Sequence, residues 1–155
     1  MDEVSIMRAD KADLPKILAL QYLAYQSEAE LFSDKKIPPL TQTLCDIEAE
    51  FDAGIFLKAV AGDEIVGSVR GHVDGQTTYV GKLIVHPKNQ DRGLGTKLLC
   101  AIERHCPTAR YELFTSTRSL RNIGLYERRG YKKFRERRLT DELTFVFFEK
   151  LLESD

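Results

Sequence analysis

The stretch Tyr79–Glu103 reads Tyr-Val-Gly-Lys-Leu-Ile-Val-His-Pro-Lys-Asn-Gln-Asp-Arg-Gly-Leu-Gly-Thr-Lys-Leu-Leu-Cys-Ala-Ile-Glu. Its apolar run predicts a strand that stops at Pro87, because proline has no N–H to give to a strand ladder. Apolar residues then recur at helical spacing from Leu94 onward. Gly93 and Gly95 lie between the two and leave the backbone open to an outside group. The stretch therefore predicts a strand, a glycine-bearing turn and an amphipathic helix.

The start of this helix is expected to bind an anion. Its first N–H groups have no partner within the helix, and the helix dipole places partial positive charge there. Without side chains at Gly93 and Gly95, a group as large as a diphosphate could reach these N–H groups. The spacing of the neighbouring glycines does not fit a Walker A loop, and no G-x-G-x-x-G opens a helix. The sequence therefore predicts a diphosphate at this turn that is bound by neither of these two nucleotide-binding motifs.

Two motifs resemble those of the GCN5-related N-acetyltransferases (GNAT superfamily). The run Gln90-Asp91-Arg92-Gly93-Leu94-Gly95 matches Gln/Arg-x-x-Gly-x-Gly/Ala, which binds the pyrophosphate of coenzyme A in that family. The run from Asn122 to Tyr131 is similar to the later motif Asn-x-x-x-Tyr-x-x-x-Gly-Phe/Tyr. The resemblance covers nearly the whole chain and implies acetyl-CoA as co-substrate. It implies contacts of the coenzyme with Leu83, Ile84, Val85, Gln90, Asp91, Arg92, Gly93, Leu94, Gly95, Thr96, Asn122 and Tyr126.

The rest of the chain predicts the order β-α-α-β-β-β-α-β-α-β-β within a single domain, residues 1–155. Such an order gives a layered α/β (α+β) fold, a mixed and mostly antiparallel seven-stranded sheet with helices on both faces. The resemblance implies the GNAT architecture, in which strands 4 and 5 splay apart around the pantetheine arm. Expected strands begin at Val4 and span 55–61, 64–73, 76–86, 110–115, 131–139 and 143–151. Expected helices span 11–27 after the N-cap Asp10, from the N-cap Thr41 to Gly54, 92–105, and from Ser119 to Gly130.

The resemblance also implies a reaction. A free amine attacks the thioester carbonyl, and Tyr126 matches the family's general acid for the departing thiolate. A tyrosine has a pKa near 10 and a thiol near 8.5, so a protonated tyrosine can make this donation at neutral pH. An alternative is that Tyr126 only continues an apolar stripe with Leu120 and Ile123. The N–H near Val85 would stabilise the oxyanion.

The base that deprotonates the attacking amine stays open. Many family members carry a glutamate on the fourth strand, but residues 79–85 contain none, and Lys82 is the only charged residue there. The loop expected over 28–40 offers two carboxylates, and the strands offer other groups. The candidates are Glu28, Glu30, His72, Tyr79 or water.

Composition narrows the class of partner. The net charge of −1 and the pI near 6.3 favour neither nucleic acid nor an anionic membrane surface as partner. Three cysteines without a CxxC pair and an acidic N-terminus without an apolar run predict a cytoplasmic protein. The three histidines show no metal-ligand spacing, so we expect no metal. Aromatic residues on the last strand leave a homodimer as an alternative to a sealed core.

The sequence thus predicts an N-acetyltransferase that acts on a primary amine by direct attack in a ternary complex. The acceptor is a small-molecule or peptide amine whose identity the sequence does not give. A protein acetyltransferase is one alternative. A second alternative is a non-catalytic module that binds acyl-CoA as a sensor, and the absent glutamate on the fourth strand leaves room for it.

Overall fold

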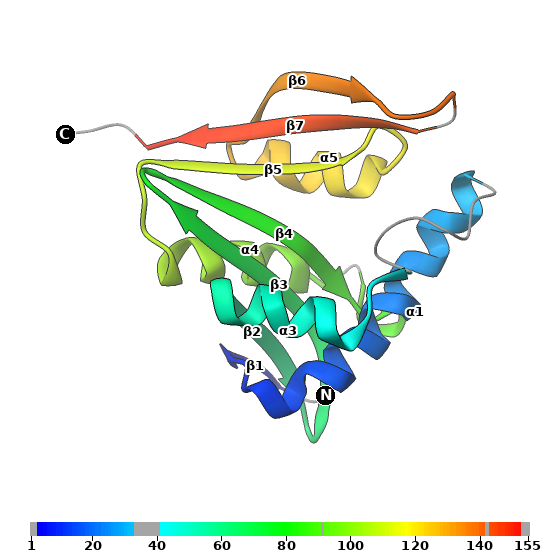
Figure 1. Cartoon of the computed structure of the whole chain (residues 1–155), viewed down its shortest axis with the longest axis vertical. Helices are drawn as coiled ribbons and strands as arrows, with labels where there is room; N and C mark the ends of the chain where they lie inside the picture. The colour runs from blue at the N-terminus through cyan, green and yellow to red at the C-terminus, as the bar shows by residue number, and fades with distance from the viewer. Residues whose placement is uncertain (1–2, 33–40, 91, 142, 153–155) are drawn as a thin grey trace.

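The chain is described here by a computed structural model that covers residues 3–32, 41–90, 92–141 and 143–152, with only the backbone described for 27–32. Within these residues seven strands form one sheet, in the order β1-β2-β3-β4-β5-β7-β6 (Figure 1). The strands are β1 (Val4–Arg8), β2 (Ile55–Ala61), β3 (Glu64–Asp74), β4 (Thr77–Val85), β5 (Arg110–Ser116), β6 (Lys132–Arg138) and β7 (Thr144–Leu151). The helices are α1 (Leu14–Phe32), α3 (Leu44–Ala53), α4 (Leu94–His105) and α5 (Leu120–Arg128), with short 3₁₀ turns at Lys11–Asp13 and Pro87–Asn89.

The sheet is divided between β4 and β5. All other neighbouring strands are antiparallel, whereas β4 and β5 are parallel and pair only from Thr77 opposite Arg110 to Tyr79 opposite Glu112. Beyond Tyr79 the two strands diverge, and Figure 1 shows the opening between them. The predicted mixed sheet, mostly antiparallel and splayed between strands 4 and 5, is therefore confirmed.

Helices cover both faces of the sheet, and each face has its own core. Leu98, Leu99 and Ile102 of α4 are fully buried against β2, β3 and β4, which confirms the apolar stripe read from the sequence. On the other face, Ile17 of α1 and Ile47 of α3 are fully buried beside Phe56. Figure 1 shows α1 and α3 in front of β2–β4, and α4 behind them. β2 and β3 contribute residues to both cores and therefore lie between them.

Several of the expected helix limits are wrong. The helix expected over 92–105 begins at Leu94, after the N-cap Gly93. The predicted loop over 28–40 begins too early, because α1 continues to Phe32; the remaining residues 33–40 lie outside the described part. Glu-Ala-Glu-Leu-Phe contains no glycine or proline that would stop a helix. The second helix is capped by Thr43 and not by Thr41. The Thr43 hydroxyl accepts from Asp46 N at 3.2 Å, and the Asp46 carboxylate accepts from Thr43 N at 2.9 Å. This reciprocal pair needs an acidic residue three positions on, which Thr41 lacks.

The expected apolar face of α5 is also offset. Leu120 is 75% exposed, whereas Leu125 and Tyr126 are buried. Leu120 is the first residue of the helix and stays exposed, so the buried stripe with Ile123 and Tyr126 does not form as predicted. The helix ends as expected, because Gly130 has a φ of +92° that favours glycine.

Candidate active site

A bulge in β4 turns one lysine to the opposite face of the sheet. Lys82 and Leu83 together lie opposite Val69 of β3, and Lys82 has a φ of +46°. Val80 belongs to the core beside α4, and Leu83 packs against the same core three residues later. In a regular strand an odd spacing would place these two on opposite faces. The extra residue therefore sends Lys82 toward α3, where its Nζ lies 3.4 Å from Glu50 Oε1.

The glycine turn after β4 is open at its first glycine. Gly93 has a φ of +77° and immediately precedes α4, and no atom lies within 4 Å of where a Cβ would stand. At Gly95 a Cβ would meet Leu125 at 3.2 Å. The Gln90 amide donates to Val85 O at 3.3 Å and accepts a hydrogen bond from Arg121, so this side chain ties β4, the turn and α5 together.

A cavity of about 540 Å³, here called the turn cavity, lies over this turn and the splayed edge of β4. Of the expected coenzyme-binding residues it brings together Leu83, Ile84, Val85, Gln90, Gly93, Leu94, Gly95, Thr96 and Asn122. Arg118, Arg121 and Arg128 also line it, and no carboxylate does so among the described residues. The cavity is therefore positively charged.

Two of the expected contacts lie outside the turn cavity, and a third expected residue lies outside the described part of the chain. Arg92 is exposed and does not line the turn cavity, and Asp91 lies outside the described residues. Tyr126 lines a second cavity of about 580 Å³, here called the charged cavity, which shares Tyr25, Leu83 and Asn122 with the turn cavity. The two cavities therefore meet where β4 and β5 separate.

Tyr126 is buried in the core and also lines a cavity, so its environment suits both the structural role and the general-acid role considered from the sequence. It is only 5% exposed, and its ring packs 6.1 Å from Tyr131 and 6.0 Å from Phe148, measured between ring centroids. It also lines the charged cavity. A buried tyrosine with one side toward a cavity is held in place by its packing, which favours a fixed position for its hydroxyl.

The four candidate base residues separate in the structure. His72 and Tyr79 both line the charged cavity. His72 Nδ1 lies 3.0 Å from the carbonyl oxygen of Ala53. A carbonyl only accepts, so Nδ1 carries the hydrogen and Nε2 is left as an acceptor. Glu28 and Glu30 belong to the last turns of α1, and their side chains lie outside the described part of the structure.

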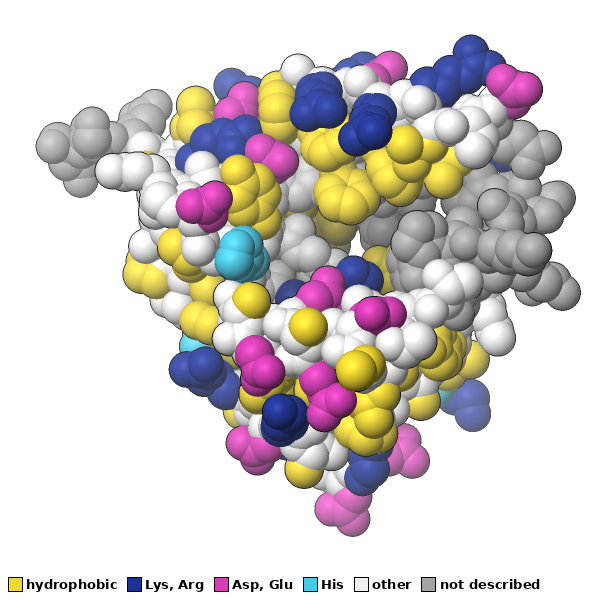
Figure 2. All heavy atoms as spheres, in the orientation of Figure 1, with side chains coloured by type: hydrophobic (Ala, Val, Ile, Leu, Met, Phe, Trp, Pro, Cys, Tyr) yellow, Lys and Arg dark blue, Asp and Glu magenta, His cyan; other side chains and the backbone are white. Residues whose placement is uncertain are grey.

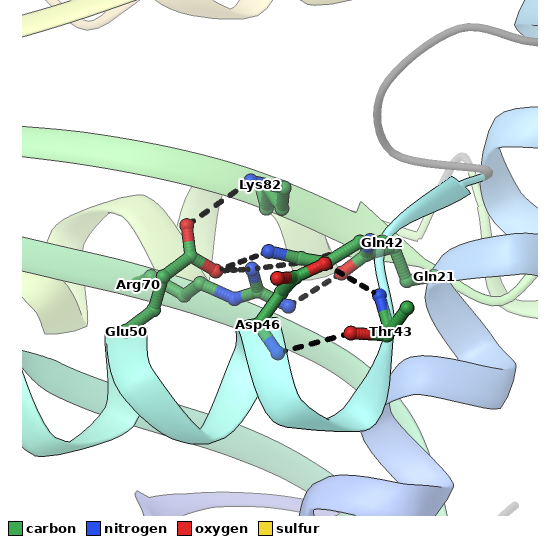
Figure 3. A network of polar contacts seen from close by, with 7 residues as sticks. All are labelled: Gln21, Gln42, Thr43, Asp46, Glu50, Arg70 and Lys82. Atoms are coloured by element: carbon green, nitrogen blue, oxygen red, sulfur yellow. Dashed lines mark hydrogen bonds and ion pairs between the residues drawn. The ribbon is translucent and has the colours of Figure 1, made fainter.

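One wall of the charged cavity is a polar network that the sequence did not predict (Figure 3). Arg70 Nη1 donates to Glu50 Oε2 at 2.6 Å and to Gln42 Oε1 at 3.1 Å, and Nη2 donates to Gln21. Gln42 Nε2 donates to the same Glu50 oxygen at 2.7 Å. Figure 3 shows these side chains, from α1, β3, α3 and the segment just before α3, converging beside Lys82 of β4. A signal was present in the sequence, because Arg70 is a charged residue within the apolar run that becomes the buried part of β3, Val66–Gly71.

Burial lowers the pKa values of both cations in this network. Desolvation lowers the pKa of the Lys82 ammonium, an effect that Glu50 opposes and Arg70 reinforces. Desolvation also lowers the pKa of Arg70, and Glu50 opposes this. Arginine remains protonated in proteins, so Arg70 keeps its charge. Arg70 and Lys82 are the cations of the cavity wall and Glu50 is its carboxylate, counting only described lining residues.

The opposite wall is apolar. Phe114 of β5 and Phe145 of β7 line the charged cavity, with their ring centroids 4.9 Å apart. In Figure 2 the surface is hollowed between the β5–β7–β6 layer and α3, with hydrophobic side chains above the hollow and acidic and basic ones below it. A molecule in this cavity would therefore have an apolar side and a polar side.

Among the described residues, the cysteines and possible metal ligands do not form a further reactive site. Within the described ranges, no three His, Cys, Asp or Glu side chains come together as metal ligands would. Burial raises the pKa of the Cys106 thiol, which disfavours a thiolate nucleophile. No helix in the same residues is both long and apolar enough to cross a bilayer.

Solved structures of other proteins share this fold. The chain superposes on the ribosomal-protein-S18-alanine N-acetyltransferase of Escherichia coli with a TM-score of 0.82 and 16% identity, over 99% of this chain and 96% of that one. The PaiA N-acetyltransferase of Thermoplasma acidophilum, solved with coenzyme A, superposes with a TM-score of 0.78 and 14% identity, over 97% of this chain and 99% of that one. YncA of Salmonella typhimurium, a putative acetyltransferase solved with acetyl-CoA, superposes with a TM-score of 0.76 and 21% identity, over 99% of this chain and 96% of that one.

In sequence, the chain is 27% identical over 119 residues to the UPF0157 protein YqkA of Bacillus subtilis. That match covers 76% of this chain, which spans only about a third (34%) of YqkA. A sequence model of the acetyltransferase (GNAT) family matches residues 17–131. The chain belongs to the acetyltransferase (GNAT) family.

Proposed function

We propose that this protein transfers the acetyl group of acetyl-CoA to a primary amine by direct attack in a ternary complex. The observation that carries the proposal is the meeting of the two cavities at Tyr25, Leu83 and Asn122. The coenzyme occupies the turn cavity and the amine occupies the charged cavity. The thioester and the amine then come together without a covalent intermediate on the protein.

The turn cavity has the chemistry that coenzyme A requires. The diphosphate binds the N–H groups at the start of α4, where the helix dipole adds roughly 0.3–1 kcal/mol, and the charge-assisted bonds to these N–H groups add more. The three arginines that line the cavity supply further positive charge. Among the described residues, β4 has no strand partner on the β5 side from Val80 onward. The main chain of Leu83 and Val85 can therefore pair with the pantetheine amides as an added strand would, with the Val85 carbonyl oxygen shared with Gln90 Nε2.

The transfer uses residues at the junction of the cavities. The amine nitrogen bonds to the thioester carbon, the carbon–sulfur bond breaks, and the Tyr126 hydroxyl gives its proton to the departing sulfur. Main-chain N–H near Val85 stabilises the oxyanion. The attacking amine loses its proton to a group in the charged cavity or to water. His72 is suited to this role, because its Nε2 is left as an acceptor.

A thiol-release assay with purified protein, acetyl-CoA and a panel of amines tests the proposal. Release of free coenzyme A that depends on both an amine and Tyr126 supports the transferase. Saturable binding of acetyl-CoA without thiol release on any amine supports the sensor instead. Measuring acetyl-CoA binding by calorimetry in parallel separates an inactive enzyme from one that has lost its coenzyme.

A further inference from the structure

The charged cavity holds one cation whose hydrogen-bonding capacity is largely unused. Lys82 Nζ can donate three hydrogen bonds, and its one contact with a described residue is Glu50 Oε1 at 3.4 Å. Arg70, by contrast, is 6% exposed and uses both of its terminal nitrogens on Glu50, Gln42 and Gln21. Arg70 therefore organises the network, and Lys82 is the group that can meet a ligand.

Glu50 does not neutralise Lys82 in the way that a close ion pair would. Its Oε2 accepts the two short bonds, at 2.6 Å from Arg70 and 2.7 Å from Gln42, whereas Lys82 lies at the longer distance from the other oxygen. With two cations and one carboxylate, the described wall of the cavity keeps an excess of one positive charge. Taking Lys82 partly out of water also strengthens its attraction for an anion.

The position of Lys82 relates this charge to the reaction. Lys82 directly precedes Leu83, which lines both cavities. Lys82 itself lines the charged cavity, so an anionic group bound to it would share this cavity with the amine of the same small molecule. Phe114 and Phe145 on the opposite wall would contact an apolar part of the same molecule.

We infer that the acceptor is a small amine that carries a carboxylate or a similar oxyanion near its amino group, in the manner of an amino acid with an apolar side chain, and that Lys82 binds this anion. The inference rests on the proposed function and names the acceptor class for it. A purely cationic acceptor such as a polyamine is disfavoured, because it would bring further positive charge to Arg70 and Lys82.

The test compares matched acceptors at fixed acetyl-CoA: L-phenylalanine, L-phenylalaninamide and phenethylamine, with spermidine as the cationic acceptor and a series of other amino acids and their amides. We expect each acid to have a kcat/KM about 10- to 100-fold above its amide, the usual value of a hydrogen bond to a charged group. The amide has the less basic and more readily deprotonated amine, so a preference for the acid reports recognition and not reactivity.

Variants locate the effect. Lys82→Met should remove the preference for the acid by raising its KM, and should leave the acetyl-CoA affinity unchanged; Lys82→Arg should retain the preference. Lys58→Met is the matched control. Lys58 is a second half-buried lysine paired with a carboxylate, at 2.8 Å from Asp13, and it lines neither cavity. This control should leave the preference intact.

The outcomes separate this inference from the proposed function. Transfer to amides or spermidine as efficient as transfer to the acids, or an acid preference that survives Lys82→Met, would overturn the inference and leave the acetyltransferase intact. If no amine is acetylated, calorimetry on the complex with coenzyme A still decides the inference. Binding of the acids over their amides, lost in Lys82→Met, supports it, and equal or absent binding of the acids contradicts it.

Discussion

The turn cavity and the charged cavity adjoin each other but are built differently. Half of the residues that line the turn cavity come from one continuous stretch, β4 to α4, which includes Gly93 and Gly95, and the others come from α1 and from α5 and the residues just before it. The charged cavity is formed by side chains from α3, β3, β4, β5 and β7, which are distant in sequence. A common ligand can be bound by backbone, whereas a particular acceptor needs side chains. The difference explains why one cavity was readable from the sequence and the other was not.

The largest expected effect is on the turn cavity. Gly93→Glu should abolish detectable binding of acetyl-CoA in calorimetry, because its side chain and its charge would occupy the place of the diphosphate. Gly75→Glu is the matched control: Gly75 also has a positive φ, +62°, with no atom within 4 Å of a Cβ, but it lies in the β3–β4 turn outside both cavities. Both variants should lose about 1–2 kcal/mol of stability. Equal acetyl-CoA affinity in the two would refute the diphosphate placement.

The second-largest expected effect is on the transfer step, at the junction of the two cavities. Tyr126→Phe should lower kcat about 10²- to 10⁴-fold, the usual contribution of a general acid, with little change in acetyl-CoA affinity. Steady-state kinetics and calorimetry measure the two quantities.

Tyr131→Phe is the control for loss of a buried tyrosine hydroxyl. Burial and Glu103 raise the pKa of Tyr131, whose hydroxyl donates to Glu103 at 2.8 Å, and Tyr131 lines neither cavity. This variant should keep its kcat. An unchanged kcat in Tyr126→Phe would remove Tyr126 from its proposed role.

A third prediction tests whether the charged cavity can be disturbed alone. Arg70→Met should lower the free energy of unfolding by about 2–3 kcal/mol, because it leaves Gln21, which is fully buried, without its Arg70 contact. The affinity for acetyl-CoA should not change. Urea unfolding and calorimetry provide these measurements.

Arg135→Met is the matched control for Arg70→Met. Both guanidinium groups stack on a phenylalanine, at 4.7 Å for Arg70 over Phe56 and 4.8 Å for Arg135 over Phe147, but Arg135 is exposed. The control should cost no more than about 1 kcal/mol. If Arg70→Met weakens acetyl-CoA binding while the control does not, the two cavities are not separable.

The smallest effect concerns the helix that carries Glu50. Thr43→Ala should lower stability by about 1 kcal/mol, because the N-cap of α3 loses its hydroxyl, and Thr41→Ala should cost less. Hydrogen bonds from Thr43 lower the pKa of Asp46 below its usual 3.8. The contribution of this carboxylate is therefore present above pH 3.8 and is lost as the pH falls through its lowered pKa. Urea unfolding at neutral and acidic pH checks both points. An equal or larger loss for Thr41→Ala would contradict the capping described here.

The fold and the turn cavity could be predicted because their signals are local. A strand, two glycines and the stripe Leu94, Leu98, Leu99, Ile102 lie next to one another in sequence, and the structure places them as expected. The charged cavity depends on a one-residue bulge at Lys82 and on contacts between residues as distant as Gln21 and Arg70. A bulge and long-range contacts produce no regular spacing of residue types in the sequence, so Glu50, Arg70 and Lys82 were not predicted as site residues.

The local errors have the same kind of cause. Thr41 and Thr43 are equally good caps by residue type, and only the reciprocal bond with Asp46 distinguishes them. Leu120 fits the helical spacing of α5 but stands at the helix start, where the sheet no longer covers it. Spacing gives the face of a helix, and the neighbouring layer decides which part of that face is buried.

A crystal structure with bound coenzyme A tests most directly whether the turn cavity binds the coenzyme and leaves the charged cavity for the acceptor. We expect the diphosphate on the main-chain N–H groups of residues 93–96, the pantetheine arm along Leu83–Val85, and the sulfur at Asn122, facing Tyr126 and the charged cavity. A diphosphate bound elsewhere, or a pantetheine arm that fills the charged cavity, would contradict the account.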